Sequence, residues 1–166
     1  MALSRQRGTR DKRAIRPIDL SGLTATLQLM GLLSIVALFA IALCLGGMVF
    51  FAACVAPLVF SRLPAEHAGR FIRGLFPIYY LYVMGLSAVA ALALLPISGV
   101  AAGLAAAVAL SALWLRQVLM KTINRLSDAA QAGDRTAAKR FDRAHRLSVI
   151  MNVLQMAVLA AVLAGF

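Results

Sequence analysis

The sequence is poor in charged residues, and acidic ones are the scarcest: 14% of its 166 residues are charged and only 6 are Asp or Glu. Three stretches, residues 20–61, 74–115 and 147–166, contain no Asp, Glu, Lys, Arg or His at all. With 62% hydrophobic residues, too little polar surface remains to cover a water-soluble globule. These absences exclude an ordinary soluble domain and indicate an integral membrane protein.

No carboxylate lies inside any of the three apolar stretches. A carboxylate proton relay, a proton-coupled transporter and paired-acid catalysis would each need at least one. The remaining Ser, His and Asp residues carry no recognisable nucleophile motif. We therefore expect a protein that is not an enzyme and has no catalytic residues.

Cysteine and histidine are also scarce. Cys44 and Cys54 stand ten residues apart, roughly 15 Å along a helix, whereas a disulfide needs Cα atoms within about 7 Å. Cys44 and Met48 lie one helical turn apart, but Cys54 is too far along to share a metal ion with them without another helix. No histidine lies in the first three expected spans to ligate haem. We expect neither a metal nor a cofactor.

The apolar stretches predict an all-α, integral membrane four-helix bundle, because about 20 residues suffice for one crossing. The second stretch divides at Pro96 to Gly99, where proline and glycine break a helix. The first has no central breaker, and its polar start, residues 21–34, is expected to be an interfacial lead-in. The predicted spans lie near residues 33–60, 76–95, 100–118 and 147–166. A five-span alternative, in which the first stretch crosses twice, remains open.

A helical hairpin is expected to protrude from the membrane between spans three and four, over residues 116–146. Gly133 is predicted to end its first helix and Asp134 to cap its second. Antiparallel pairing about Gly133 then predicts two exposed ion pairs, Arg125 with Asp142 and Asp128 with Lys139.

Span four carries a polar stripe. His145, Ser148, Asn152 and Gln155 fall within about an 80° arc of one helix. Amides inside a span need partners, so they are expected to face protein or water. One interpretation is interhelical hydrogen bonding; the other is a polar pocket with His145 at its mouth. The hairpin register predicts that Gln117 and Lys121 face this stripe, and Lys121 would then make the pocket suit an anionic headgroup.

Small residues predict where helices approach closely in lipid. On span three, Gly99, Gly103, Ala107 and Ser111 recur every four residues, a pattern that favours packing within the bundle or, alternatively, a dimer face. Gly46 and Gly47 are expected to pack against a neighbouring helix in the same way. The aromatic residues that open span two are expected at the membrane interface: Phe76, Tyr79, Tyr80 and Tyr82.

The basic residues cluster outside the spans, where anionic lipid headgroups are their natural counterions. The formal charge is +11, but no RNA-binding motif or zinc spacing accompanies it, so nucleic acid is not expected as a partner. The two loops on one side carry 11 basic residues and the tail, residues 1–20, carries 6. We expect a cell inner membrane protein, and the positive-inside rule predicts both termini on the non-cytoplasmic side. A start at Met30 would remove the tail.

The chain resembles the TMEM205-like (DUF4149) domain family of small four-span membrane proteins over roughly residues 30–166, and more distantly CopD-like and HemJ-like membrane proteins. The residues that carry the resemblance are 45–51 (LGGMVFF), 56–57 (AP), 63–64 (LP), 68–70 (AGR), 75–80 (LFPIYY), 123–128 (INRLSD) and 145–148 (HRLS), with Phe60, Phe141, Asn152 and Gln155. The resemblance implies a domain over residues 21–166 that follows the basic tail. It brings no established biochemical mechanism with it.

Three functional interpretations follow. The first is a non-enzymatic interaction or accessory module that binds a membrane-protein partner, a second copy of the chain or anionic lipid. The second is a small transporter or efflux component that uses the polar stripe of span four. The third is a redox protein that binds a metal or haem.

Overall fold

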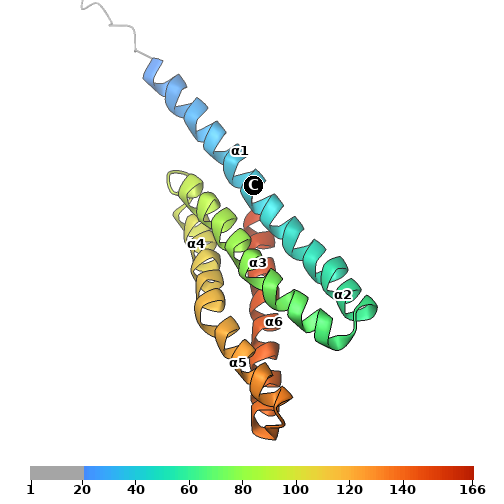
Figure 1. Ribbon diagram of the computed structural model, residues 1–166. Coiled ribbons are helices and arrows are strands. Elements are labelled where there is room, and N and C mark those ends of the chain that lie inside the picture. The colour runs from blue at the N-terminus through green and yellow to red at the C-terminus, as the bar shows by residue number, and fades with distance from the viewer. Residues whose placement is uncertain (1–20) are drawn as a thin grey trace, which may run out of the picture.

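The computed structural model describes residues 21–166, which are almost entirely helical (Figure 1). The basic tail, residues 1–20, lies outside the described residues. The helices follow one another in the order α1 (Ser21–Phe50), η1 (Phe51–Val55), α2 (Ala56–Arg62), α3 (Ala65–Leu94), α4 (Gly99–Trp114), η2 (Leu115–Leu119), α5 (Met120–Gln131) and α6 (Arg135–Ala164). Both η elements are single π-helical turns inside longer helices.

Four helical rods in this part of the chain are long and apolar enough to cross a membrane: Ser21–Arg62, Ala65–Leu94, Gly99–Gln131 and Arg135–Ala164. The predicted all-α membrane bundle is confirmed. The five-span alternative is wrong, because residues 21–62 run as one rod that never reverses direction (Figure 1). The expected division of the second stretch is also correct, since α3 ends at Leu94 and the Ser98 hydroxyl caps α4 by accepting from the Ala101 N–H at 3.3 Å.

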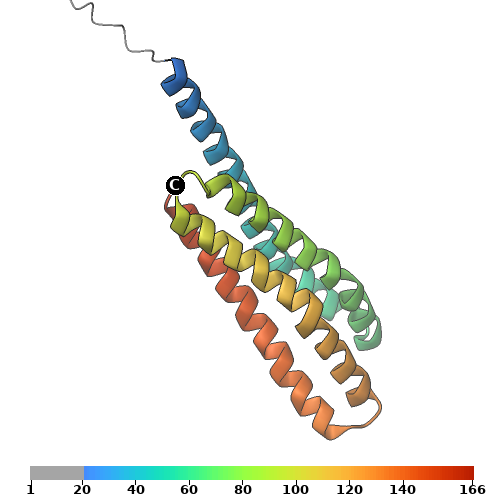
Figure 2. The same ribbon diagram turned by 90° about the vertical axis from the view of Figure 1, so that its left-hand side faces the viewer.

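The first turns of α1 extend beyond the turn between α3 and α4 (Figure 2). Every residue from Ser21 to Leu32 is exposed. The hydroxyl groups of Thr24, Thr26 and Ser34 donate to backbone carbonyls of the same helix at 2.9 Å. These polar side chains are therefore satisfied within the helix and need no protein partner.

The bundle core contains many alanines. α3 packs against α1 and α4, and α6 packs against α1, α4 and α5. Ala40, Ala90, Ala105 and Ala112 are buried where these helices meet. Small side chains let helix axes approach closely, which is how helices associate where lipid supplies no hydrophobic drive.

The hairpin turn matches its prediction. Gly133 has φ +97°, a left-handed conformation that suits glycine at the end of a helix. Asp134 then caps α6, because its carboxylate accepts from the N–H groups of Thr136 at 2.7 Å and Ala137 at 3.0 Å.

The predicted glycine packing is right at one of four positions. At Gly47, a Cβ atom would lie 2.6 Å from the Tyr82 hydroxyl oxygen, so a larger residue there would require the Tyr82 ring to move. At Gly46, Gly99 and Gly103, a Cβ would meet nothing within 4 Å in the described structure. For Gly99 and Gly103 the reason is that α4 buries its alanine face and leaves these glycines exposed: the buried residues are Ala102, Ala105, Val108, Ala109 and Ala112.

Candidate ligand-binding groove

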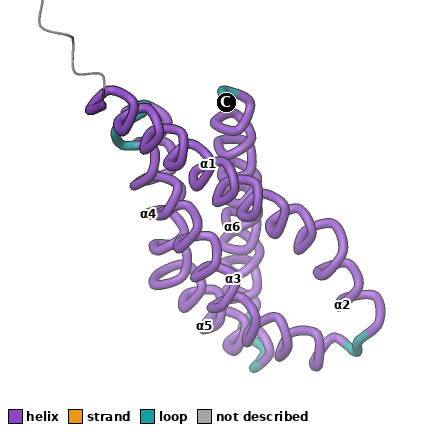
Figure 3. Tube along the Cα trace, turned by 90° about the horizontal axis from the view of Figure 1, so that it is seen from above, coloured by secondary structure: helices purple, strands orange, loops and turns teal. Residues whose placement is uncertain are grey.

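An open groove of about 870 Å³ separates two parts of the bundle that we call the arm (residues 56–73, α2 and the start of α3) and the hairpin (residues 120–146). Seen from above, the arm splays away from α5 and α6 (Figure 3). Apolar side chains line the inner part of the groove: Met48, Phe51, Phe76, Val153 and Met156. Charged and amide side chains line its mouth: Glu66, Arg70, Arg73, Asn124, Asp128 and Gln131. The groove is thus amphipathic along its length.

The aromatic floor depends on the π-helical turn η1. Pro57 has no N–H to give to the carbonyl four residues earlier, and the chain responds with a wider turn in which the Ala56 N–H bonds to the Phe51 carbonyl. Phe51 then packs against Phe76 and Tyr79, with ring centroids 5.6 and 4.6 Å apart. Single π turns of this kind are frequent at functional sites.

A hydrogen-bonded pair lies inside the groove. The Tyr79 hydroxyl donates to Asn152 Oδ1 at 2.8 Å, and Asn152 Nδ2 donates to the Ser148 carbonyl at 2.8 Å. Tyr79 and Ser148 are buried and Asn152 is half-buried. Tyr79 was expected at the membrane interface, but its hydroxyl finds its partner inside the bundle, so the ring turns inward.

His145 lies at the mouth, the position that one of the two interpretations of the stripe gives it. Its ring is exposed and stacks on Phe141, with centroids 5.9 Å apart and planes within 5°. A small cavity of about 40 Å³ adjoins the groove, and its polar lining comes from Arg73, Tyr80, Asn124, His145 and Ser148. That volume is enough for a water molecule with several polar partners.

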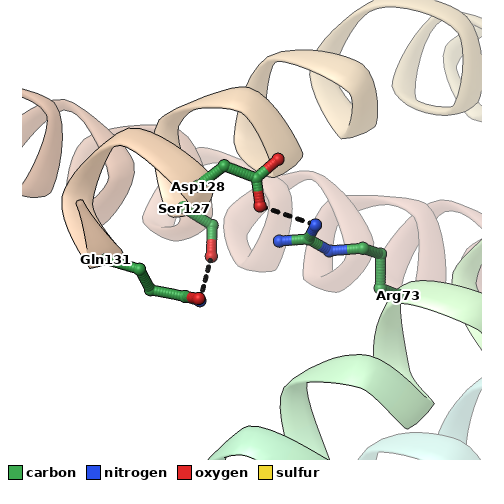
Figure 4. A network of polar contacts seen from close by, with 4 residues as sticks. All are labelled: Arg73, Ser127, Asp128 and Gln131. Carbon is green, nitrogen blue, oxygen red and sulfur yellow. Dashed lines mark hydrogen bonds and ion pairs between the residues drawn. The ribbon is translucent and has the colours of Figure 1, made fainter.

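An ion pair spans the mouth. Arg73 on α3 donates to Asp128 on α5 at 2.7 Å (Figure 4). One turn further along α5, Gln131 donates to the Ser127 hydroxyl at 3.3 Å (Figure 4). The ion pair ties the arm to the hairpin, and the bond between Gln131 and Ser127 lies within α5 beside it.

Gln155, the last residue of the stripe, lies outside this groove. It is buried, and its Nε2 donates to the Ser111 hydroxyl at 2.8 Å between α6 and α4. Its Oε1 has no hydrogen-bond partner within the described structure. The stripe therefore divides: His145, Ser148 and Asn152 face the groove, and Gln155 joins two helices.

Gln117 and Lys121 were expected to face the stripe, and that prediction is wrong. Both are exposed and neither lines the groove. The hairpin register fixes only the level of a residue along the helices. From the end of the π turn η2 onward, the side of the helix that faces α3 and α6 carries other residues: Leu119, Met120, Ile123 and Asn124.

The two predicted hairpin ion pairs are also wrong. Within residues 21–166 the ion pairs are Glu66 with Arg70, at 2.9 Å, and Arg73 with Asp128. Asp128 does not reach Lys139, because its face of α5 looks into the groove toward α3. Arg125 contacts Thr122 on its own helix at 3.5 Å instead of Asp142.

Sequence reasoning missed Arg73, Asn124, Ser127 and Gln131 as groove residues. A usable signal existed for Arg73, which is the last charged residue before the second apolar stretch. No group of three or more His, Cys, Asp or Glu side chains comes together in the described part of the chain.

A family model described as a domain of unknown function, DUF4149, matches residues 39–132. The chain belongs to this family. No curated protein and no solved structure matches it. The DUF4149 match ends before α6, so it does not cover the last part of the expected resemblance.

Within the DUF4149 region lie the arm, the aromatic floor and the α5 side of the mouth, including Arg73, Tyr79 and Asp128. The remaining wall comes from α6, through His145 and Asn152. The groove in this protein therefore combines the family region with the helix that follows it.

Proposed function

We propose that this DUF4149 protein is a non-enzymatic membrane module that binds an amphiphilic molecule in the groove. The observation that carries the proposal is the change of polarity along the groove, from the aromatic floor at Phe51 to the ion pair at Arg73. Ligand pockets in proteins are of this size and are mostly apolar with a few placed polar groups. A molecule with an apolar tail and a polar head matches that distribution.

The amphiphile would come from the bilayer itself. Large apolar side chains on the arm are exposed beside the groove, among them Leu58, Phe60 and Phe71. Such side chains favour lipid over water, so the groove would open toward membrane lipid.

The groove mouth would face the cytoplasm in a cell inner membrane. The arm and the hairpin lie at one end of the bundle, opposite the start of α1 (Figure 1). Together with the adjoining η2 turn, their sequence segments carry 11 Lys and Arg residues, against 6 in the tail. This excess supports a cytoplasmic arm and hairpin by the positive-inside rule.

A groove-filling variant tests the binding function. Gly69 lines the groove, and a Cβ there would meet nothing within 4 Å among the described residues, so Gly69→Phe should fill the groove without disturbing the bundle. Gly74→Phe is the matched control, because Gly74 is also exposed and open on α3 but does not line the groove. Both changes replace a helix-interior glycine, so neither should weaken the helix.

The measurement is the amount of lipid retained after purification in mild detergent, from mass spectrometry of the organic extract. We expect Gly69→Phe to lose most of the retained amphiphile, and Gly74→Phe to keep it. Equal retention in the two variants would contradict binding in the groove.

A second candidate is a small transporter. It is favoured by the continuation of polar groups from Asn152 to Gln155, whose buried Oε1 accepts no hydrogen bond from residues 21–166. An Asn152→Leu, Gln155→Leu double variant that remains folded should then lose a substrate-dependent phenotype. If that phenotype persists, transport along the stripe is excluded.

A further inference from the structure

The ion pair between Arg73 and Asp128 differs from the other ion pair at the groove mouth. It joins two helices on opposite walls, whereas Glu66 and Arg70 stand one turn apart on α3. The side chains of Glu66 and Arg70 are 75% and 76% exposed, but Arg73 is only 37% exposed and Asp128 is 60% exposed. Arg73, the less exposed partner, therefore needs the ion pair more than Asp128 does.

Release of the pair would leave Asp128 in water and Arg73 half-buried. A carboxylate that is 60% exposed regains hydration easily, whereas a guanidinium that is 37% exposed still needs an acceptor. Ion pairs between partly exposed groups are weak, so another anion can compete for the arginine. The planar fork of arginine suits phosphate oxygens as well as it suits a carboxylate.

The end of the molecule that holds this pair is strongly basic. Residues 62–146 include 11 Lys and Arg against 4 Asp and Glu, a net charge of +7, and all of them lie in the arm, in the hairpin or in the η2 turn next to it. Anionic phospholipids are enriched at such surfaces, each basic residue adding to the attraction. Charge complementarity therefore selects an anionic headgroup over a neutral one.

We propose that the groove takes an anionic phospholipid whose phosphate replaces the Asp128 carboxylate on Arg73 and thereby releases the hairpin from α3. This inference rests on the proposed function, because it names the amphiphile and the change that its binding causes. The acyl chain lies over the apolar floor near Phe51 and Val153. The Asn124 amide and the Ser127 hydroxyl, which line the groove within a turn of Asp128, supply further hydrogen-bond donors.

Two acidic variants with the same change in charge provide the test. Asp128→Asn frees Arg73, whereas Glu66→Gln removes an equal charge from the same groove and frees only the exposed Arg70. The probes are nanodiscs of phosphatidylglycerol or of phosphatidylcholine, and the readout is lipid retained per protein after transfer to detergent.

We expect Asp128→Asn to bind phosphatidylglycerol about threefold more tightly, the scale of a weak ion pair removed from competition. Glu66→Gln should differ little from the wild type, and phosphatidylcholine retention should not change in either variant. Arg73→Gln should lose the preference for phosphatidylglycerol.

A distance measurement reports the release of the hairpin. Spin labels at His67→Cys on the arm and Arg135→Cys on the hairpin, in a Cys54→Ser background, use two exposed positions and leave the buried Cys44 in place. We expect phosphatidylglycerol to lengthen and broaden the distance distribution in the wild type. Asp128→Asn should show the broad distribution already in phosphatidylcholine, and inorganic phosphate alone should not produce it.

Several results would overturn the inference. If Asp128→Asn and Glu66→Gln raise phosphatidylglycerol retention equally, the effect is one of general charge, and the phosphate does not replace a carboxylate on Arg73. If the distance between the two spin labels does not change in phosphatidylglycerol, the hairpin is not released by lipid. If inorganic phosphate alone lengthens that distance, the site binds anions in general and does not require a lipid. In all three cases the loss of lipid in Gly69→Phe would still support the proposed function, whereas retention of no lipid at all would remove both.

Discussion

The hydroxyl of Tyr79 on α3 donates a hydrogen bond of 2.8 Å to Oδ1 of Asn152 on α6, across the inner part of the groove. The two residues are separated by 73 positions, and their bond fixes the relative rotation of two helices that form opposite walls. Because Asn152 Nδ2 is engaged by the Ser148 carbonyl, the amide orientation is held from both sides. The wall that a ligand meets is therefore rigid at this depth.

The Tyr79 and Asn152 pair should show measurable coupling. We expect Tyr79→Phe and Asn152→Leu each to destabilise the protein, with a coupling energy of about 1 kcal/mol in a double-mutant cycle, typical of hydrogen bonds between membrane helices. The free energies of unfolding come from denaturation with sodium dodecyl sulfate in mixed micelles. Strictly additive effects would mean that the bond contributes nothing.

Gly47 and its neighbour Gly46 should respond oppositely to alanine. In Gly47→Ala the new methyl group would meet the Tyr82 ring, whose hydroxyl is anchored to the Leu43 carbonyl, so a loss of roughly 1–3 kcal/mol is expected. Gly46→Ala has open space among the described residues and should be neutral or stabilising. The same unfolding measurement checks both variants, and adding Tyr82→Ala should restore the stability that Gly47→Ala loses. If stability is not restored, contact with Tyr82 is not the cause of the loss.

The outward glycines of α4 should tolerate large side chains. Gly103 is exposed, and a Cβ there has nothing within 4 Å in residues 21–166, so Gly103→Leu should change the unfolding free energy by less than about 0.5 kcal/mol. Ala105 is fully buried, and Ala105→Leu should cost about 1–3 kcal/mol.

The two variants also separate packing from association. If Gly103→Leu leaves the monomer stable but abolishes a dimer seen in mild detergent, the glycine face joins two copies.

The sequence was sufficient for features that depend on composition or on one turn of chain. The lengths of the apolar stretches predict the four spans. Gly133 and Asp134 predict the hairpin turn, because a left-handed residue followed by a capping carboxylate is a local arrangement. The inward orientation of Ser148 and Asn152 follows in the same way, since polar groups in a span must find partners.

The predictions that were wrong concern features that depend on how a helix is rotated about its own axis. Glycine and alanine are both small, so the pattern of α4 could not decide whether Gly103 or Ala105 faces the bundle. The π turns η1 and η2 change the facing of the residues that follow them, and only η1 has a visible cause, Pro57. The Arg73 and Asp128 pair joins residues 55 positions apart, which no local pattern connects.

The most direct test of lipid binding in the groove is photo-crosslinking with a phosphatidylglycerol that carries a diazirine near the end of its acyl chain. The crosslinked peptides would be mapped by mass spectrometry in the wild type and in Gly69→Phe. The account predicts attachment to groove residues, chiefly Phe51, Val153 and Met156, and its loss in Gly69→Phe. Attachment spread over outward residues such as Val100 and Leu110 of α4, unchanged in Gly69→Phe, would contradict it.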